Sequence, residues 1–153
     1  MKFGIQLNHE YEKGDDLQLR MDELIAQTEC ARDCGYSQLN GLHHYLSSLA
    51  TFQPLPLLSR LVPHSGDMKL GIGVYLTLES PVQMAENFAT LDQMSGGRLV
   101  LGLGGGYRPN EFAAFGIDRP SRWSRCLETV EVVRKLWSGE EVNHRGRHFT
   151  IEG

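Results

Sequence analysis

Four short runs with the character of strands, each followed by a stretch with the spacing of an amphipathic helix, limit the folds open to this chain more than any other feature. The runs cover residues 3–7, 36–40, 69–76 and 98–103; the second of them, Tyr-Ser-Gln-Leu-Asn, is only weakly patterned. Strands that alternate with helices along a chain predict a parallel sheet with helices packed outside it. The third run is apolar almost throughout, which is typical of a strand covered on both faces. We therefore expect an α/β protein, with residues 1–153 as a single domain.

Recognisable residues mark where the helices begin and end. Asp15 is expected to cap the first helix, with Gln18 in the capping-box position and Gly35 as its stop. Ser80 and Pro81 form a strong start for the third helix. The remaining expectations are a second helix at 54–62, a last helix capped by Ser121, and a tail at 139–153 that forms a small hairpin or an extended arm.

Helical spacing also predicts which side chains face the core. Cys30 and Cys34 share one face of the first helix and are expected to be buried thiols. The other residues expected to face inward are Leu17, Met21, Leu24, Ile25, Thr28 and Ala31 in the first helix, Val82, Ala85, Phe88, Ala89 and Leu91 in the third, and Trp123, Leu127, Val130, Val133, Leu136 and Trp137 in the last.

Charge and composition argue against several partners. The net charge is −4 and no basic run stands out, so neither nucleic acid nor an anionic membrane surface is an expected partner. No apolar run approaches the length of a membrane span, and the first residues do not resemble a signal peptide. Three scattered cysteines fit a reducing cytosol, so we expect a cytoplasmic protein. The histidines at 9, 43, 44 and 64 lack the spacing of a zinc site, so no metal is expected.

The number of strand–helix units raises a second question about the fold. A complete (β/α)8 TIM barrel takes about 250 residues, whereas this chain has 153 residues and four of the eight units. An open doubly wound sheet and the first half of a barrel both fit the pattern. A half-barrel leaves its first and fourth strands as open edges, which soluble proteins rarely leave bare. Two copies that pair these edges would approximate a closed barrel, so we expect a homo-oligomer.

Polar residues and glycines follow the predicted strands. Asn8 follows the first strand, His43 and His44 follow the second, Thr77 follows the third, and residues 104–107 follow the fourth. Because the carboxyl ends of parallel strands meet at one edge of a sheet, we expect a ligand site there. A histidine in such a site can donate or accept a proton near neutral pH. The alternatives are solvated loop histidines, strand-end caps and a tight glycine turn.

The glycine-rich stretch at 102–106 fits a dinucleotide-binding fingerprint poorly. The pattern G-x-G-x-x-G requires glycine where Tyr107 or Pro109 stands, and no helix is expected to begin within it. A glycine loop at the carboxyl end of a strand nevertheless allows a ligand to approach the backbone closely. The stretch is therefore a candidate for ligand contact without being a Rossmann motif.

Three sets of motifs accompany these elements. Residues 91–99 read Leu-Asp-Gln-Met-Ser-Gly-Gly-Arg-Leu, and residues 42–45 read Leu-His-His-Tyr. Beyond the fourth strand come Glu-Phe-x-x-Phe-Gly at 111–116, Arg-x-x-Glu at 125–128 and Trp-Ser-Gly-Glu at 137–140. Together these motifs resemble the bacterial luciferase-like family of flavin-dependent monooxygenases, and the resemblance spans nearly the whole chain.

The resemblance implies a (β/α)8 barrel that binds reduced FMN or, in one branch, the deazaflavin F420. With reduced FMN and O2, members of this family oxygenate a small organic substrate. His43 falls on the family's catalytic histidine, and His44 is its neighbour. Gly73 and Val74 match a bulge, often a cis peptide, that supports the flavin ring. With Thr77 from the strand-end argument, the expected cofactor residues are Asn8, Gly73, Val74, Thr77, Gly104, Gly105, Gly106 and Tyr107.

Departures from the family pattern keep three functions open. Leu42 stands where the family has glutamate, and Gly105 stands where bacterial luciferase places a phosphate-binding arginine. The main phosphate site of a barrel follows strands seven and eight, beyond the four units present here. The chain is expected to be a flavin-dependent monooxygenase, an F420-dependent oxidoreductase, or a non-catalytic half-barrel module that dimerises. For an enzyme, the expected partners are the flavin, a small-molecule substrate and a flavin reductase.

Overall fold

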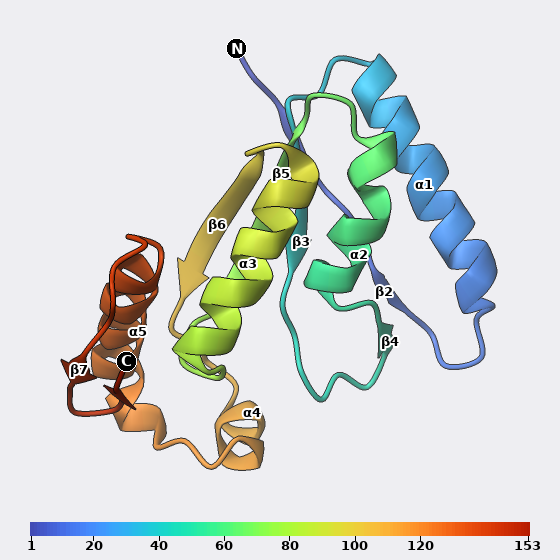
Figure 1. The fold of residues 1–153 in the computed structure, drawn as a ribbon. Coiled ribbons are helices and arrows are strands. Elements are labelled where there is room, and N and C mark those ends of the chain that lie inside the picture. Colours follow the sequence, from blue (N-terminus) through green and yellow to red (C-terminus); the bar gives the residue numbers. More distant parts are fainter. The chain divides into compact units, whose positions relative to one another are not determined.

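The computed structural model describes all residues from 1 to 153. The chain divides into two compact units: unit 1 comprises residues 1–73 and 91–102, and unit 2 comprises residues 74–90 and 103–153. The elements follow in the order β1 (Gly4–Gln6), β2 (Glu10–Tyr11), α1 (Leu17–Asp33), β3 (Gln38–Leu42), β4 (Ala50–Thr51), α2 (Pro54–Leu61), η1 (Val62–His64), β5 (Lys69–Tyr75), α3 (Pro81–Ser95), β6 (Leu99–Gly104), α4 (Pro109–Ala114), η2 (Arg119–Ser121), α5 (Arg122–Leu136), β7 (His144–Arg145) and β8 (Thr150–Ile151) (Figure 1).

A four-stranded sheet has the strand order β1-β3-β5-β6. β3 pairs in parallel with both β1 and β5, with Ile5 opposite Leu39 and Asn40 opposite Gly71. Two small antiparallel pairs accompany the sheet, β2 with β4 and β7 with β8. The parallel α/β arrangement expected from the apolar runs is confirmed. Of the two alternatives for the tail, the structure has the hairpin.

The core of unit 1 lies between the sheet and its helices. Gly41 of β3 allows α2 to approach closely, because a Cβ atom at this position would lie 3.0 Å from Cβ of Pro54. Burial of a leucine side chain contributes roughly 1.5–3 kcal/mol to stability. The buried apolar side chains of this core include Leu24, Leu39, Leu57, Leu58, Leu61, Leu70 and Ile72.

The opposite face of the sheet in unit 1 is polar. Gln38 and Asn40 alternate with the buried Leu39, and the side-chain amide of Gln38 donates to Oδ1 of Asn40. Nδ2 of Asn40 donates to the carbonyl of Ile5 at 3.2 Å. A Cβ atom at Gly71 would overlap the Asn40 side chain, so glycine is required for the Asn40 amide to lie across β5. This face carries hydrogen-bonding groups instead of an apolar core.

Unit 2 is organised around α5. Thr129 is buried within it although it is polar, because its hydroxyl lies 3.2 Å from the carbonyl of Leu76 and 2.9 Å from that of Arg125. Nε of Arg125 also donates to the carbonyl of Thr77 at 2.9 Å. These bonds tie α5 to the segment that follows β5.

One carboxylate of α5 forms several of the contacts that attach the hairpin of β7 and β8, alongside a 2.8 Å hydrogen bond between Ser124 and His148. Glu128 of α5 accepts hydrogen bonds from the amides of His148 and Phe149 at 3.0 and 2.9 Å, and from Nε2 of His144 at 3.2 Å. Burial acts to raise the pKa of Glu128, but these hydrogen bonds outweigh it and hold the pKa below its ordinary value. The hairpin is therefore attached through a charged carboxylate.

The predicted cap of α1 is wrong by one residue. Oδ1 of Asp16 accepts hydrogen bonds from the amides of Gln18 and Leu19 at 3.0 and 3.2 Å, which makes Asp16 the cap. Asp15 instead forms an ion pair with Arg20 at 3.2 Å. Two adjacent aspartates at a helix start offer two possible caps, and the sequence pattern does not distinguish between them.

Other local predictions also need correction. The second strand begins at residue 38 instead of 36, because the amide of Tyr36 still bonds to the carbonyl of Ala31 at the end of α1. Helix α4 was not predicted, since six residues are too few to display a helical period. Cys30 and Cys34 are exposed, not buried.

The inward faces of three helices are predicted only in part. In α1, Leu24, Thr28 and Ala31 are buried as expected, but Leu17 is exposed. In α3, Ala85, Phe88 and Leu91 are buried as expected, and Met84 is buried although it was not expected to be. The residues exposed against expectation are Val82 and Ala89 in α3, Trp123 and Leu127 in α5, and Trp137 directly after α5. None of the helices combines the length and apolar character needed to cross a membrane.

Candidate functional site

The predicted site residues fall into two groups, one in each unit. Unit 1 contains Asn8, His43, His44 and Gly73, and unit 2 contains Val74, Thr77 and residues 104–107. The structure brings residues together within each group, and each group is described by itself.

His43 begins the loop between β3 and β4, which we call the histidine loop (residues 43–49). Its amide donates to the carbonyl of Gly73 at 2.9 Å, so the loop starts at the carboxyl end of the parallel strands in unit 1. The His43 ring is buried, 9% exposed, and lies 4.5 Å from the ring of Tyr45 between centroids. The alternative of a solvated loop histidine is therefore wrong for His43.

The remainder of the histidine loop is also well ordered by contacts. Nε2 of Gln53 donates to the carbonyl of His44 at 2.8 Å. At the far end of the loop, Thr51 of β4 pairs with Glu10 of β2. Leu46 has φ of 51°, the left-handed region that a leucine enters at a cost of about 1–3 kcal/mol.

A cavity of about 260 Å³ lies beside the histidine loop. It brings together two predicted residues, Asn8 and His44, and adds His9, which was considered in the sequence only as a zinc ligand. No lysine or arginine lines this cavity. The lining residues are Gln6, Leu7, Asn8, His9, Glu10, Leu42 and His44.

Gly73 has a structural role within unit 1. A Cβ atom at this position would lie 2.6 Å from Cδ2 of Leu42, so glycine makes room for the Leu42 side chain. Leu42 is the residue that departs from the glutamate of the family pattern, and this contact accommodates it. The peptide bonds of the chain are all trans, including the one between Gly73 and Val74. Val74 is buried as a whole residue, 1% exposed, so neither its side chain nor its backbone lies open to a ligand in this structure.

In unit 2, Thr77 and the glycine loop (residues 104–107) do lie together. Oγ1 of the fully buried Thr77 donates to the carbonyl of Gly105 at 3.0 Å. Gly106 has φ of 74°, and a Cβ atom there would lie 3.1 Å from Cζ of Phe112. A Cβ atom at Gly105 would lie 2.9 Å from Cζ3 of Trp123. Both glycines are thus required by packing within unit 2.

Tyr107 ends the glycine loop and is exposed. Its ring meets that of Tyr75 edge to face, with centroids 6.2 Å apart. Burial, with a smaller contribution from the neighbouring Tyr107, raises the pKa of Tyr75 to about 12. The carbonyl of Gly104 accepts a hydrogen bond from the amide of Leu76 at 3.1 Å, which continues the sheet into the loop.

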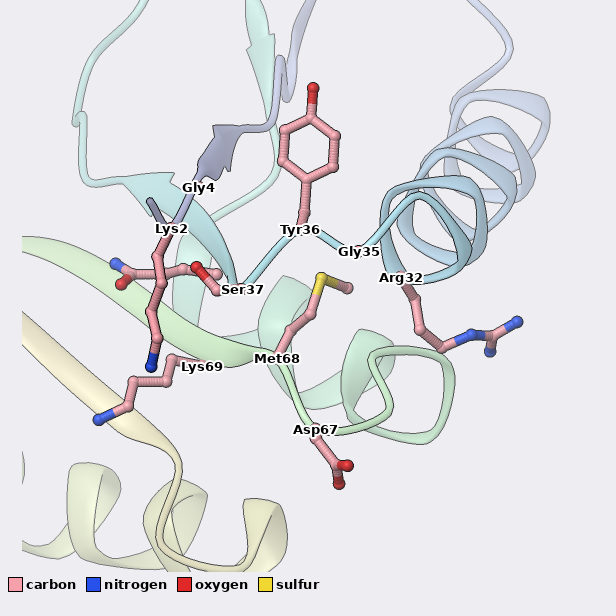
Figure 2. Close-up of a pocket in the computed structure, with 10 residues that line it drawn as sticks. Lys2, Gly4, Arg32, Gly35, Tyr36, Ser37, Asp67, Met68 and Lys69 are labelled. Atoms are coloured by element: carbon pink, nitrogen blue, oxygen red, sulfur yellow. The ribbon is translucent and has the colours of Figure 1, made fainter.

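A wider cavity of about 590 Å³ lies at the amino ends of β1, β3 and β5, away from every predicted site residue. Figure 2 shows the Lys2 and Lys69 side chains ending on the same side of the view, whereas Arg32 lies on the other side and points away from them. Arg32 forms an ion pair with Asp33 at 2.8 Å. The cavity is lined by Lys2 and Lys69 together with the acidic Asp67, and it contains no histidine.

Comparison with known proteins gives one family. A family model described as luciferase-like monooxygenase matches residues 1–153. F420-dependent hydroxymycolic acid dehydrogenase from Mycobacterium tuberculosis is 31% identical to this chain, and the match covers 97% of this chain and 42% of that protein.

Solved structures agree with this match. Monooxygenase RslO1 from Streptomyces bottropensis has a TM-score of 0.90 at 28% identity, covering 99% of this chain and 47% of that one. The oxygenating constituent of 3,6-diketocamphane monooxygenase from Pseudomonas putida, solved in complex with FMN, has a TM-score of 0.87 at 21% identity, covering 99% of this chain and 43% of that one. The chain thus spans less than half the length of these relatives.

Proposed function

Since this chain belongs to the luciferase-like monooxygenase family, we propose that it is the first half of a (β/α)8 barrel in a flavin-dependent monooxygenase. In this proposal the enzyme uses reduced FMN and O2 to oxygenate a small organic substrate. The observation that carries the proposal is the buried ring of His43, held by its amide at the carboxyl end of the parallel strands. This is where barrel enzymes place their catalytic groups.

The residues of the histidine loop are assigned different roles. His43 is the catalytic histidine, and it holds or donates a proton through Nε2, because its Nδ1 is buried. Asn8 and His44 contact the polar edge of the cofactor ring from the cavity they line. When bound, reduced FMN supplies the electrons that activate O2.

The cavity fits part of a flavin, not all of it. Its volume of about 260 Å³ lies just below the roughly 300–1,000 Å³ of pockets that hold a complete drug-sized ligand. Its polar side chains suit the ring edge, but its lack of lysine and arginine provides no countercharge for a phosphate. We therefore assign ring contact to this chain and expect the phosphate to be held by residues beyond it.

An F420-dependent oxidoreductase is the second candidate. It is favoured by the relative from Mycobacterium tuberculosis, whose name states F420 dependence and which is 31% identical over almost the whole of this chain. His43 keeps its proton-transferring role in this candidate, and O2 is not required.

The test compares the two cofactors on the same protein. Reduced FMN and reduced F420 are titrated anaerobically, and O2 uptake is then measured with a panel of small organic substrates. The proposal predicts saturable binding of reduced FMN and O2 uptake that depends on it. Binding of F420 alone would favour the second candidate, and binding of neither would contradict both.

A further inference from the structure

His9 links the two ends of the histidine loop. Its ring Nε2 accepts a hydrogen bond from the amide of Leu42, the last residue of β3, at 3.1 Å. Its backbone carbonyl accepts a hydrogen bond from the amide of Phe52, directly after β4, at 3.0 Å. One buried residue, 3% exposed, therefore contacts the backbone on both sides of the loop.

The ring of His9 takes the place of a missing strand carbonyl. The amide of Leu7 donates to the carbonyl of Asn40 at 3.0 Å, which is the last ladder contact between the β1 and β3 segments. Leu42 lies two residues beyond Asn40, so its amide points toward the same neighbouring segment. There it meets an imidazole nitrogen instead of a carbonyl. This hydrogen bond fixes the backbone of β3 as far as Leu42, the residue before His43.

This geometry fixes the protonation of the ring. A nitrogen that accepts an amide hydrogen carries no proton of its own, so the neutral His9 ring is protonated at Nδ1. Nδ1 is buried, and hydrogen bonding of the ring to the Phe52 backbone acts to raise the pKa of His9. Nε2 meanwhile accepts the hydrogen of a backbone amide.

We propose that His9 is a positioning residue that sets the place of His43 through its hydrogen bonds to Leu42 and Phe52. The inference rests on the proposed role of His43. Protonation of the His9 ring at Nε2 would remove the acceptor and break the hydrogen bond from the amide of Leu42. Burial is the largest influence and lowers the pKa of His9; hydrogen bonding to the Phe52 backbone and the charge of nearby Glu10 act in the opposite direction, and nearby His44 lowers it further.

The test uses two nearly isosteric substitutions of His9. His9→Gln keeps an acceptor oxygen near the position of Nε2, whereas His9→Met has a similar length and only a thioether sulfur. Amide hydrogen exchange of Leu42 is expected to be about tenfold faster in His9→Met and close to the original protein in His9→Gln. The amide of Phe52 is the internal control, because it bonds to the backbone carbonyl that both variants retain. His64→Gln is the matched control, since His64 pairs with Glu29 at 2.8 Å and has no bond to the loop.

Two further readouts separate this inference from the proposed function. Ring ¹⁵N shifts of the original protein are expected to show a proton on Nδ1 of His9, and protection of the Leu42 amide is expected to fall as acid protonates the ring. These measurements apply even where His9→Met does not fold. If the protein oxygenates a substrate with reduced FMN and O2, kcat for that reaction should be lower in His9→Met and close to the original value in His9→Gln. Unchanged exchange at Leu42, or a proton on Nε2, overturns the role of His9 whatever the activity. Lack of turnover with the exchange result intact overturns only the proposed function.

Discussion

The two units use their predicted site residues in different ways. In unit 1, His43 and His44 lie on a loop held by backbone hydrogen bonds, and His44 lines a cavity with Asn8. In unit 2, the glycine loop is occupied by its own neighbours, with Trp123 against Gly105 and Phe112 against Gly106. Glycine in a loop thus signals close packing as readily as ligand contact, whereas a histidine at the carboxyl end of parallel strands places an ionisable group where barrel enzymes bind ligands.

Among the substitutions that test this difference between the units, the change at His43 is expected to have the largest effect, a loss of turnover. His43→Gln should lower turnover by about 10²–10⁴-fold, because it removes a group that can carry a proton. The free energy of unfolding should change little, since the variant keeps the hydrogen bond from the backbone amide of residue 43 to the carbonyl of Gly73. Steady-state kinetics measure the loss, with His64→Gln as control. Full activity of His43→Gln would remove the chemical role from unit 1.

The glycine loop can be tested by a matched pair of alanine substitutions. Gly116 has φ of 65° with open space around a Cβ atom, so Gly116→Ala should cost about 1–2 kcal/mol through strain alone. Gly106→Ala should cost about 1 kcal/mol more, because its new methyl group meets Phe112. Urea denaturation compares the two. Equal costs would show that packing does not explain Gly106, and a ligand role would gain weight.

The carboxylate of Glu128 should make the stability of unit 2 depend on pH. Its pKa is below the ordinary value of 4.5, so its contribution is complete above that value and is lost as pH falls through the folded-state pKa. Glu128→Gln is expected to lower the free energy of unfolding by about 1–3 kcal/mol at neutral pH. It should also weaken the fall of this free energy at acidic pH. Denaturant unfolding across acidic pH measures both. If stability falls at acidic pH as steeply in the variant as in the original protein, the loss is due to other carboxylates.

Substitutions at the amino ends of the strands in unit 1 are expected to have the smallest effect on cofactor affinity. Lys2 and Lys69 line the cavity at the amino ends of the strands, whereas barrel enzymes bind ligands at the carboxyl ends. The double substitution Lys2→Gln and Lys69→Gln should leave the affinity for reduced FMN unchanged. Fluorescence titration checks this. A clear loss of affinity would move the cofactor to the amino edge.

The apolar run of β5 made the parallel sheet predictable, because a strand that is buried on both faces is almost wholly apolar. Periodicity predicted helix faces less well, because polar groups can be buried when they are bonded. Thr129 is such a case, since its hydroxyl lies near two backbone carbonyls. His9 was missed as a site residue for the same reason. Its neighbours in the sequence do not reveal that the amide of Leu42, 33 residues away, needs an acceptor.

The site residues show a similar division. The position of His43 at the end of a strand was readable from the sequence, but its burial was not. The role of Gly73 depends on the Leu42 side chain of the neighbouring strand, which a linear pattern cannot supply. Contacts between strands and loops decide such cases, and they appear only once the register is known.

The most direct test of the account is amide hydrogen exchange of the protein with and without reduced FMN under anaerobic conditions. Residues 8–10 and 42–46, which border the cavity and the histidine loop, should exchange more slowly when the cofactor is bound. The amides around Lys2 and Lys69 should not change. Unaltered exchange in residues 8–10 and 42–46 at saturating cofactor would contradict the assignment of the flavin ring to the histidine loop.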